Sequence, residues 1–390
     1  MRSSSSLLNR TVKNRVKITP KPLYSSHDEF TPLRINNGLP RDDHHKQLIK
    51  QYVAATIYIL SGATQPLLMT IVKNAGLADS VCQVYMLAYY LGPSMLSFLA
   101  CAGSNRAPIP IILYLKAAGI ALIDIIAQST NYTGATLAGP TIFAIIYSSV
   151  TVWTAIYSRI MLQRKLRLPQ WVGIFIVFGG LSITAKSSVS IGPDVFHGAV
   201  LVILGSSLHA MTYVLSEAIM NSQSTSSTQK ISVEMNCAIQ GVIASSVFIL
   251  WQILYTRKHF EDKIYLPMKE AGTSIEKASA ILISLSLSNL VHSYSFFYTL
   301  KHFPGGATSA GVMKGVQAVL VFIFSSMVYC GTIGGDEMCF STIKFISLVV
   351  VIGGMLLYSA ATDMQAVGPN RYAKLNDGQF TGEESNIVAV

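Results

Sequence analysis

The sequence contains little charge. Only 12% of its 390 residues are Asp, Glu, Lys or Arg, against roughly 25% in ordinary globular domains, whereas 51% are hydrophobic. The mean hydropathy is +0.46. This composition excludes a soluble multidomain protein and predicts a polytopic membrane protein.

Several functional motifs are absent from the sequence. It has no Walker A glycine–lysine motif, which argues against transport driven by ATP, and no HExxH or Ser/His/Asp constellation that would indicate an enzyme. No cofactor is expected. The net charge of +10 does not indicate nucleic-acid binding either, because ten of the 29 Lys and Arg residues lie in the first 50 residues and no basic patch is interleaved with aromatics.

Cysteine is also scarce. The five cysteines are odd in number and share no metal-ligand or CxxC spacing, so we interpret them as structural thiols and expect no metal site. Cys330 and Cys339 flank one short loop, and they could pair in an oxidising lumen.

Apolar segments of about 20 residues, the length that a bilayer core requires, repeat from residue 47 onward. Residues 1–46 have no apolar period and no signal-peptide core, so we expect a disordered basic tail there, and a second tail at 363–390. Turn residues mark the breaks between the segments, among them NYTG between the third and the fourth. We expect ten spans, near 48–72, 80–101, 109–129, 133–161, 169–187, 195–220, 232–255, 277–301, 305–330 and 338–361.

The Lys and Arg residues of the loops predict that both termini are cytosolic. With the N-terminus in the cytosol, the basic cluster that includes Arg159, Arg164 and Arg167 also lies on the cytosolic side. The polar loop TRKHFEDKIYLPMKEAGTSIEK, between the seventh and eighth spans, then lies on the opposite side, with four acids that offset its bases. An even number of spans returns the C-terminus to the cytosol.

The chain contains an internal repeat. GATLAG at Gly134 matches GATSAG at Gly306 in five of six positions, and FGGL, with Gly179 and Gly180, is repeated as IGGM further on. These matches pair the fourth span with the ninth and the fifth with the tenth. A repeat of five spans must cross the membrane in the opposite sense in its second copy, which is typical of secondary transporters with a site near the midplane. The predicted fold is therefore all-α, with ten transmembrane helices in two inverted five-helix repeats, at 47–190 and 191–362.

This arrangement resembles that of the drug/metabolite transporter superfamily. The basic link RKLRLPQWVGIFIVFGGL, which leads into a GG-containing fifth span, is part of the resemblance. The resemblance covers residues 47 to 361 and is greatest to the branch of nucleotide-sugar transporters and sugar-phosphate translocators. It implies alternating access, and residence in the Golgi or another endomembrane, with the plasma membrane, plastid or mitochondrion as alternatives. In the resembling families a lysine of the ninth span contacts the anionic part of the substrate, which implies this role for Lys314.

Lys314 stands in an otherwise uncharged span, where a lysine costs roughly 2.5–3.5 kcal/mol on insertion scales. At helical spacing it shares one face with Ala310, Gln317 and Ala318, so we expect it to face a central cavity. The alternative is that Lys314 pairs with an intramembrane acid and holds the two halves together. Asp124 is the candidate acid; it could neutralise Lys314, serve as a proton site, or do neither.

Other polar residues of the spans are candidates for lining a cavity, although hydroxyls in membrane helices often bond only across helices. Metal binding by the two span histidines is not expected, because neither has a second ligand at a recognisable spacing; a structural hydrogen bond or proton coupling stays open. Besides Lys314 and Gln317, the candidate substrate-binding residues are Gln65, Tyr147, Ser148, His209, Tyr213, Ser288, Asn289, His292 and Ser295, and the candidates for coupling or charge pairing are Asp124 and Glu217.

The sequence thus predicts a secondary transporter for a small polar, anionic metabolite, such as a nucleotide sugar or an organic phosphate, and antiport is favoured. One alternative is a transporter of neutral or cationic molecules, which gains if Asp124 rather than Lys314 contacts the substrate. Another is a membrane scaffold or receptor without transport activity. The expected partners are the lipid bilayer and a small-molecule substrate. Glycine-rich faces on the fifth and tenth spans could support a homodimer or pack within the monomer.

Overall fold

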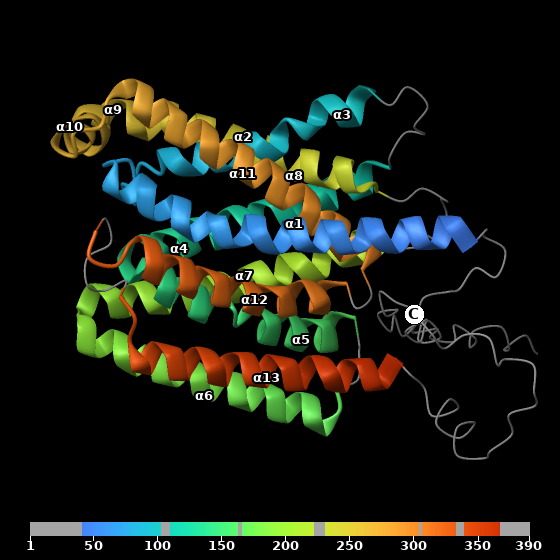
Figure 1. Cartoon of the computed structure of the whole chain (residues 1–390). Coiled ribbons are helices and arrows are strands. Elements are labelled where there is room, and N and C mark those ends of the chain that lie inside the picture. Colours follow the sequence, from blue (N-terminus) through green and yellow to red (C-terminus); the bar gives the residue numbers. More distant parts are fainter. Residues whose placement is uncertain are drawn as a thin grey trace, which may run out of the picture.

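The computed structural model describes residues 41–102, 110–162, 166–221, 231–303, 306–332 and 339–366. All regular secondary structure in these ranges is helical (Figure 1). The helices are α1 (Arg41–Asn74), α2 (Val84–Ser94), α3 (Leu96–Ala102), α4 (Ile111–Tyr147), α5 (Val150–Met161), α6 (Leu168–Ile191), α7 (Pro193–Asn221), α8 (Val233–Trp251), η1 (Gln252–Thr256), α9 (Arg257–Phe260), η2 (Glu261–Tyr265), α10 (Leu266–Glu270), α11 (Ile275–His302), α12 (Ala307–Val328) and α13 (Thr342–Ala366).

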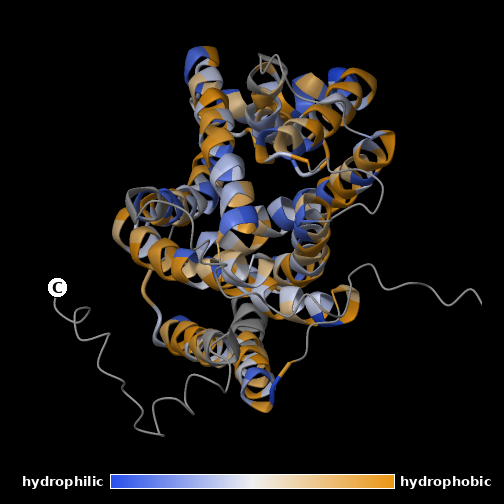
Figure 2. Ribbon diagram, turned by 90° about the vertical axis from the view of Figure 1, so that its right-hand side faces the viewer, coloured by the Kyte–Doolittle hydropathy of each residue, from blue (hydrophilic) through white to orange (hydrophobic). Residues whose placement is uncertain are grey.

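The helices form a bundle with an apolar outside. Within the described ranges, six helical stretches are long and apolar enough to cross a membrane, and the segments Leu168–Ile183 and Thr342–Tyr358 are shorter apolar helices. Many large hydrophobic side chains, such as Phe98, Phe175 and Met327, are exposed. Figure 2 shows hydrophobic segments around the outside of the bundle and more hydrophilic ones across its middle. This is the pattern of a helical membrane protein, so the prediction of an all-α, multi-pass membrane protein is confirmed at this level.

The predicted break at NYTG is wrong. Helix α4 runs through these residues. Its kink lies further on, at Gly139, which has a φ of 78° and is followed by Pro140. Gly134 serves packing rather than a turn: a Cβ there would lie 2.7 Å from the Gly198 carbonyl oxygen of α7. The glycine that suggested a turn in the sequence thus allows two helices to approach closely.

The predicted polar loop after the seventh span is also largely helical. The chain continues from α8 through η1, α9, η2 and α10 without a break before residue 271. This continuous helical stretch contains two π-helical segments, η1 and η2. Pro267 lies in the first turn of α10, where its missing N–H group is tolerated. At the N-terminal end, α1 begins at Arg41, inside the range expected to be a tail; residues 1–40 and 367–390 of the two expected tails lie outside the described residues.

Two pairs of helices pack against each other over much of their length in the bundle (Figure 1). Helix α4 packs along α7, and α6 packs along α13 at one edge of the bundle. The α6–α13 contact is close because Gly173 and Gly354 face each other's backbone carbonyl groups. Part of the glycine-rich surface expected to support a homodimer is therefore used within the chain, and the homodimer itself stays a prediction.

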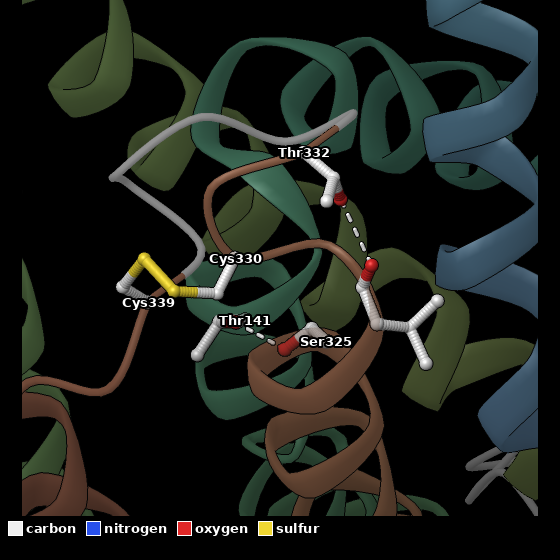
Figure 3. The surroundings of a disulfide bond; sticks show 6 residues. Thr141, Ser325, Cys330, Thr332 and Cys339 are labelled. Carbon is white, nitrogen blue, oxygen red and sulfur yellow. Dashed lines mark hydrogen bonds between the residues drawn. A yellow bond between two sulfur atoms is a disulfide. The ribbon is translucent and has the colours of Figure 1, made fainter.

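The start of α1 and the end of α13 lie at the same end of the bundle (Figure 1). At the opposite end, a disulfide bond joins Cys330 and Cys339 across the connection between α12 and α13 (Figure 3). The neighbouring Tyr329 donates a hydrogen bond to the Leu67 carbonyl group of α1 at 3.2 Å, and Ser325 lies 2.7 Å from the Thr141 hydroxyl of α4. The pairing that the sequence left open is thus present.

We expect the disulfide to be detectable by mass tagging. In a variant with Cys82, Cys101 and Cys237 replaced by Ser, the denatured protein should take up no maleimide tag before reduction and two tags after it, because both remaining thiols are oxidised. A further Cys330→Ser change should leave one thiol that is tagged without reduction. Two tags on the unreduced protein would show that the pair is not formed.

Candidate functional site

Two cavities lie inside the bundle, and they share Tyr89, Gln128 and His292. The first contains Lys314 in its wall and has about 430 Å³ of space between atoms, part of it open to solvent. Its other lining residues come from α1, α2, α4, α11 and α12, and they are Gly62, Gln65, Pro66, Tyr89, Gln128, Tyr132, Phe143, Ala144, Tyr147, His292, Gln317, Ala318 and Val321. The second has about 520 Å³ of such space, and Asp124 and His209 lie in its wall.

The Lys314 side chain is 5% exposed and lies among aromatic rings. Its ammonium nitrogen is 5.1 Å from the centre of the Tyr58 ring and 5.2 Å from that of Tyr147, within cation–π range. It also lies 3.4 Å from His292 Nε2, and His292 Nδ1 lies 3.1 Å from the Ser61 hydroxyl. No Asp or Glu of the described ranges lies within 4 Å of this ammonium group.

Lys314 lies on the inward side of α12, together with small residues and Gln317. Ala310, Gln317 and Ala318 are all buried, whereas Val316 and Ile323 on the other side are exposed. This confirms the predicted orientation of the helix. The inner face packs closely on α5, where the Thr151 hydroxyl donates to the Gly311 carbonyl oxygen at 2.7 Å.

Asp124 contacts His209, not Lys314. His209 Nδ1 lies 2.8 Å from one carboxylate oxygen of Asp124, and the Tyr90 hydroxyl donates to the other at 2.8 Å. Of the three roles that the sequence left open for Asp124, direct neutralisation of Lys314 is therefore not made in this structure.

Hydrogen bonds between side chains fix the walls of the first cavity. Gln317 donates to the Tyr58 carbonyl oxygen at 2.9 Å. Gln65 donates to the Ser288 hydroxyl at 3.2 Å and accepts from Tyr132 at 3.2 Å. These bonds tie α12, α11 and α4 to α1, so the polar groups around Lys314 are held by four helices.

The structure brings most of the candidate residues to the two cavities. Seven of the candidate substrate-binding residues line a cavity, namely Gln65, Tyr147, His209, Tyr213, His292, Lys314 and Gln317. Ser288 stands behind Gln65.

The remaining candidates make contacts of a structural kind. Asn289 donates to the Tyr89 carbonyl oxygen, whereas Ser148 and Ser295 bond carbonyl groups of their own helices. Glu217 accepts from the Ala307 N–H at 3.0 Å, at the positive end of the α12 dipole. These four residues do not line either cavity.

Sequence reasoning missed an aromatic enclosure around the site. Tyr58, Tyr89 and Tyr132, with Phe143, lie at or beside the first cavity, and the Tyr89 and Tyr132 rings are 5.1 Å apart. The cluster YMLAYY at 85–90 was the available signal, because three tyrosines in one short apolar stretch exceed what lipid contact requires.

Comparisons with known proteins agree with the prediction of a transporter. No protein-family model matches the chain. Solute carrier family 35 member F6 of Rattus norvegicus is 21% identical over 65% of this chain and 68% of its own length. The Mus musculus protein of the same name is 20% identical over 67% of this chain and 72% of its own.

One crystal structure of a protein with 13% sequence identity has a TM-score of 0.53 and covers 77% of this chain and 98% of its own; this likeness concerns the fold alone. The sequence similarity to the two solute carriers concerns the family and the general function of the chain. The chain is a distant homologue of the solute carrier family 35 member F6 proteins, which confirms its resemblance to the drug/metabolite transporter superfamily and supports a membrane transporter.

Proposed function

We propose that the protein is a secondary active transporter that exchanges a small polar, anionic metabolite across a membrane by alternating access. The observation that carries this proposal is Lys314, a lysine buried in the bundle beside a cavity and without an acidic partner among the described residues. A buried charge is costly unless it is paired. The anionic group of a substrate supplies the missing partner.

The surroundings of Lys314 favour an anion that carries a ring. Tyr58 and Tyr147 flank the ammonium group, and Phe143 stacks on Tyr147 with 5.0 Å between the ring centres. Flat aromatic faces of this kind accept a base or a sugar ring by stacking. A nucleotide sugar or an organic phosphate, exchanged for its mononucleotide or phosphate, is therefore the substrate class that we propose.

We further propose ten membrane spans in two inverted repeats, 47–190 and 191–362. In this scheme the five spans of the first half are α1, α2 with α3, the first part of α4, the second part of α4 with α5, and α6. The five spans of the second half are α7, α8, α11, α12 and α13. The packing supports a two-fold relation: α1 packs on α11 as α7 packs on α4, and α12 packs on α1 as α5 packs on α7. Rocking of one half against the other would expose the cavities to each side in turn.

The disulfide supports the proposed orientation. With cytosolic termini, the connection between α12 and α13 faces the opposite compartment, and a disulfide persists in an oxidising lumen rather than in the cytosol. A Golgi or other endomembrane location agrees with this chemistry, and so does the plasma membrane.

One observation favours a second candidate. The second cavity contains a carboxylate, Asp124, so a neutral or cationic substrate could bind there instead. Asp124 already accepts bonds from His209 and Tyr90, which leaves it less available to a cationic ligand than Lys314 is to an anion. The polar groups in both cavities count against a scaffold without transport activity, because such a bundle could fill these positions with Leu and Ala.

Uptake by the purified protein in liposomes tests the substrate class. The panel contains labelled nucleotide sugars, nucleotides, sugar phosphates, nucleobases and organic amines. We expect an anion from the first three classes to accumulate and the bases and amines to be excluded, since the cation at Lys314 selects for negative charge. Uptake of amines or bases while every anion is ignored would contradict the proposal and favour the second candidate.

A further inference from the structure

The second cavity holds a pair of ionisable groups that the proposed exchange of anions does not use. Asp124 of α4 and His209 of α7 are joined at 2.8 Å, and their side chains are 14% and 10% exposed. The cavity beside them shares three lining residues with the Lys314 cavity. The two charged groups Lys314 and Asp124 thus occupy neighbouring chambers without touching each other.

The hydrogen bonds of the pair leave room for one further proton. The Tyr90 hydroxyl donates to one carboxylate oxygen of Asp124, and His209 Nδ1 lies 2.8 Å from the other. When one proton bridges Asp124 and His209 Nδ1 and none sits on His209 Nε2, the pair carries one negative charge. Among the described residues, His209 Nε2 has one hydrogen-bond contact, with Gln128 Nε2 at the long distance of 3.5 Å, and this nitrogen is the position for the further proton.

Other titratable groups surround the pair from every packed helix. They are Tyr89 and Tyr90 on α2, Tyr147 on α4, Tyr213 on α7, Cys237 on α8 and His292 on α11. Lys314 on α12 reaches His292 from the other chamber. Tyrosine and cysteine are neutral near pH 7, so the charge balance of the two chambers is set by Lys314, the histidines and Asp124.

Charge balance links the two chambers. When no substrate is bound, the cation at Lys314 and the anionic Asp124–His209 pair offset each other inside the bundle. An anion bound at Lys314 removes that balance and leaves the pair as an uncompensated negative charge in a medium of low dielectric constant. Addition of one proton from water to His209 Nε2 forms an imidazolium–carboxylate pair without net charge. This removes one unit of the excess negative charge, which is the whole excess for a singly charged anion.

We propose that the Asp124–His209 pair is a proton-binding site that fills when an anion occupies the Lys314 cavity, so that net transport moves a proton together with the anion. This inference rests on the proposed function. During exchange of one anion for another, the proton stays on the Asp124–His209 pair, so no net proton movement is needed. Net uptake without a counter-anion carries the proton across and releases it on the far side.

The test uses liposomes that contain the full-length protein and a pH-sensitive dye inside, with UMP, UDP-glucose and inorganic phosphate as probes. For the probe that the wild type transports, net uptake should acidify the interior in proportion to the anion taken up. Asp124→Asn should lower the proton flux per anion at least tenfold, because the neutral amide no longer stabilises a protonated His209. Anion-for-anion exchange without a pH gradient should persist in this variant, at a reduced rate.

His209→Asn provides a second variant, in case Asp124→Asn fails to fold, and it should also lose the proton flux. Thr130→Ala, on the same helix, is the matched control, because its hydroxyl bonds only the Ile126 carbonyl oxygen of its own helix; it should keep the wild-type ratio.

The outcomes separate the two proposals. If the wild type transports the anion without any proton movement, the proton site is wrong and the proposed function stands. If Asp124→Asn keeps the full proton flux, the proton resides on Lys314 or His292 and the assignment to the pair is overturned. If the wild type transports none of the anions, the proposed function fails and this inference fails with it.

Discussion

Replacement of Lys314 by alanine is expected to lower anion uptake at least about 30-fold, because removing one partner of a buried charge pair costs roughly 2–5 kcal/mol and each 1.4 kcal/mol corresponds to a factor of ten. The measurement is kcat/KM for the transported anion in proteoliposomes. Lys116→Ala is the matched control: this lysine is on the exposed surface of α4 and does not line either cavity, so its loss should leave uptake unchanged.

The stability of the same variant separates a binding role from a structural one. Lys314 has no acidic partner in direct contact among the described residues, so Lys314→Ala removes a desolvation cost. A proton taken up by the Asp124–His209 pair keeps the charge of the bundle balanced, so the variant should unfold at the same temperature as the wild type or a higher one. The unfolding temperature of the detergent-solubilised protein gives this readout. A variant that still transports but unfolds earlier would show that the lysine holds the helices together and does not bind substrate.

Gly134→Leu is expected to destabilise the protein by about 3 kcal/mol or more, through overpacking at the contact between α4 and α7. A Cβ at this position would lie 2.7 Å from the Gly198 carbonyl oxygen and 2.7 Å from a methyl carbon of Val202. Backbone atoms cannot rotate away as a side chain can, so the two helices must separate. Because α4 carries Asp124 and α7 carries His209, their separation also disrupts the second cavity.

Gly119→Leu, on the same helix, tests whether this effect is local. Nothing lies within 4 Å of a Cβ at Gly119, so the added side chain should point into open space. We expect the unfolding temperature and the elution profile of this variant to match the wild type. Equal destabilisation by both substitutions would show that the effect does not depend on the α4–α7 contact.

The all-helical fold could be predicted from the sequence because the signal is simple. Segments of apolar residues long enough for a bilayer can be recognised without knowledge of their neighbours, and so can the inward face of α12, where Lys314 and Gln317 share a helical spacing with small residues. The position of Lys314 in a cavity wall agrees with that reasoning.

Features that depend on contact between distant residues could not be predicted in this way. The sequence does not distinguish a turn at Gly134 from a close helix contact, because both require glycine, and only the position of α7 decides between them. The partner of Asp124 is His209, 85 residues further along the chain, and the choice between His209 and Lys314 depends on how α4, α7 and α12 are arranged. The Tyr58 and Tyr147 rings around Lys314 likewise come from two different helices.

The most direct test of the account is a counterflow measurement. Liposomes containing the wild-type protein are loaded with an unlabelled anion, a neutral nucleoside or buffer alone, and the accumulation of the labelled anion from outside is followed over time. The account predicts transient accumulation above the equilibrium level in the anion-loaded liposomes alone, and its loss in Lys314→Ala. Counterflow of a neutral or cationic solute in both proteins, with every anion ignored, would contradict it.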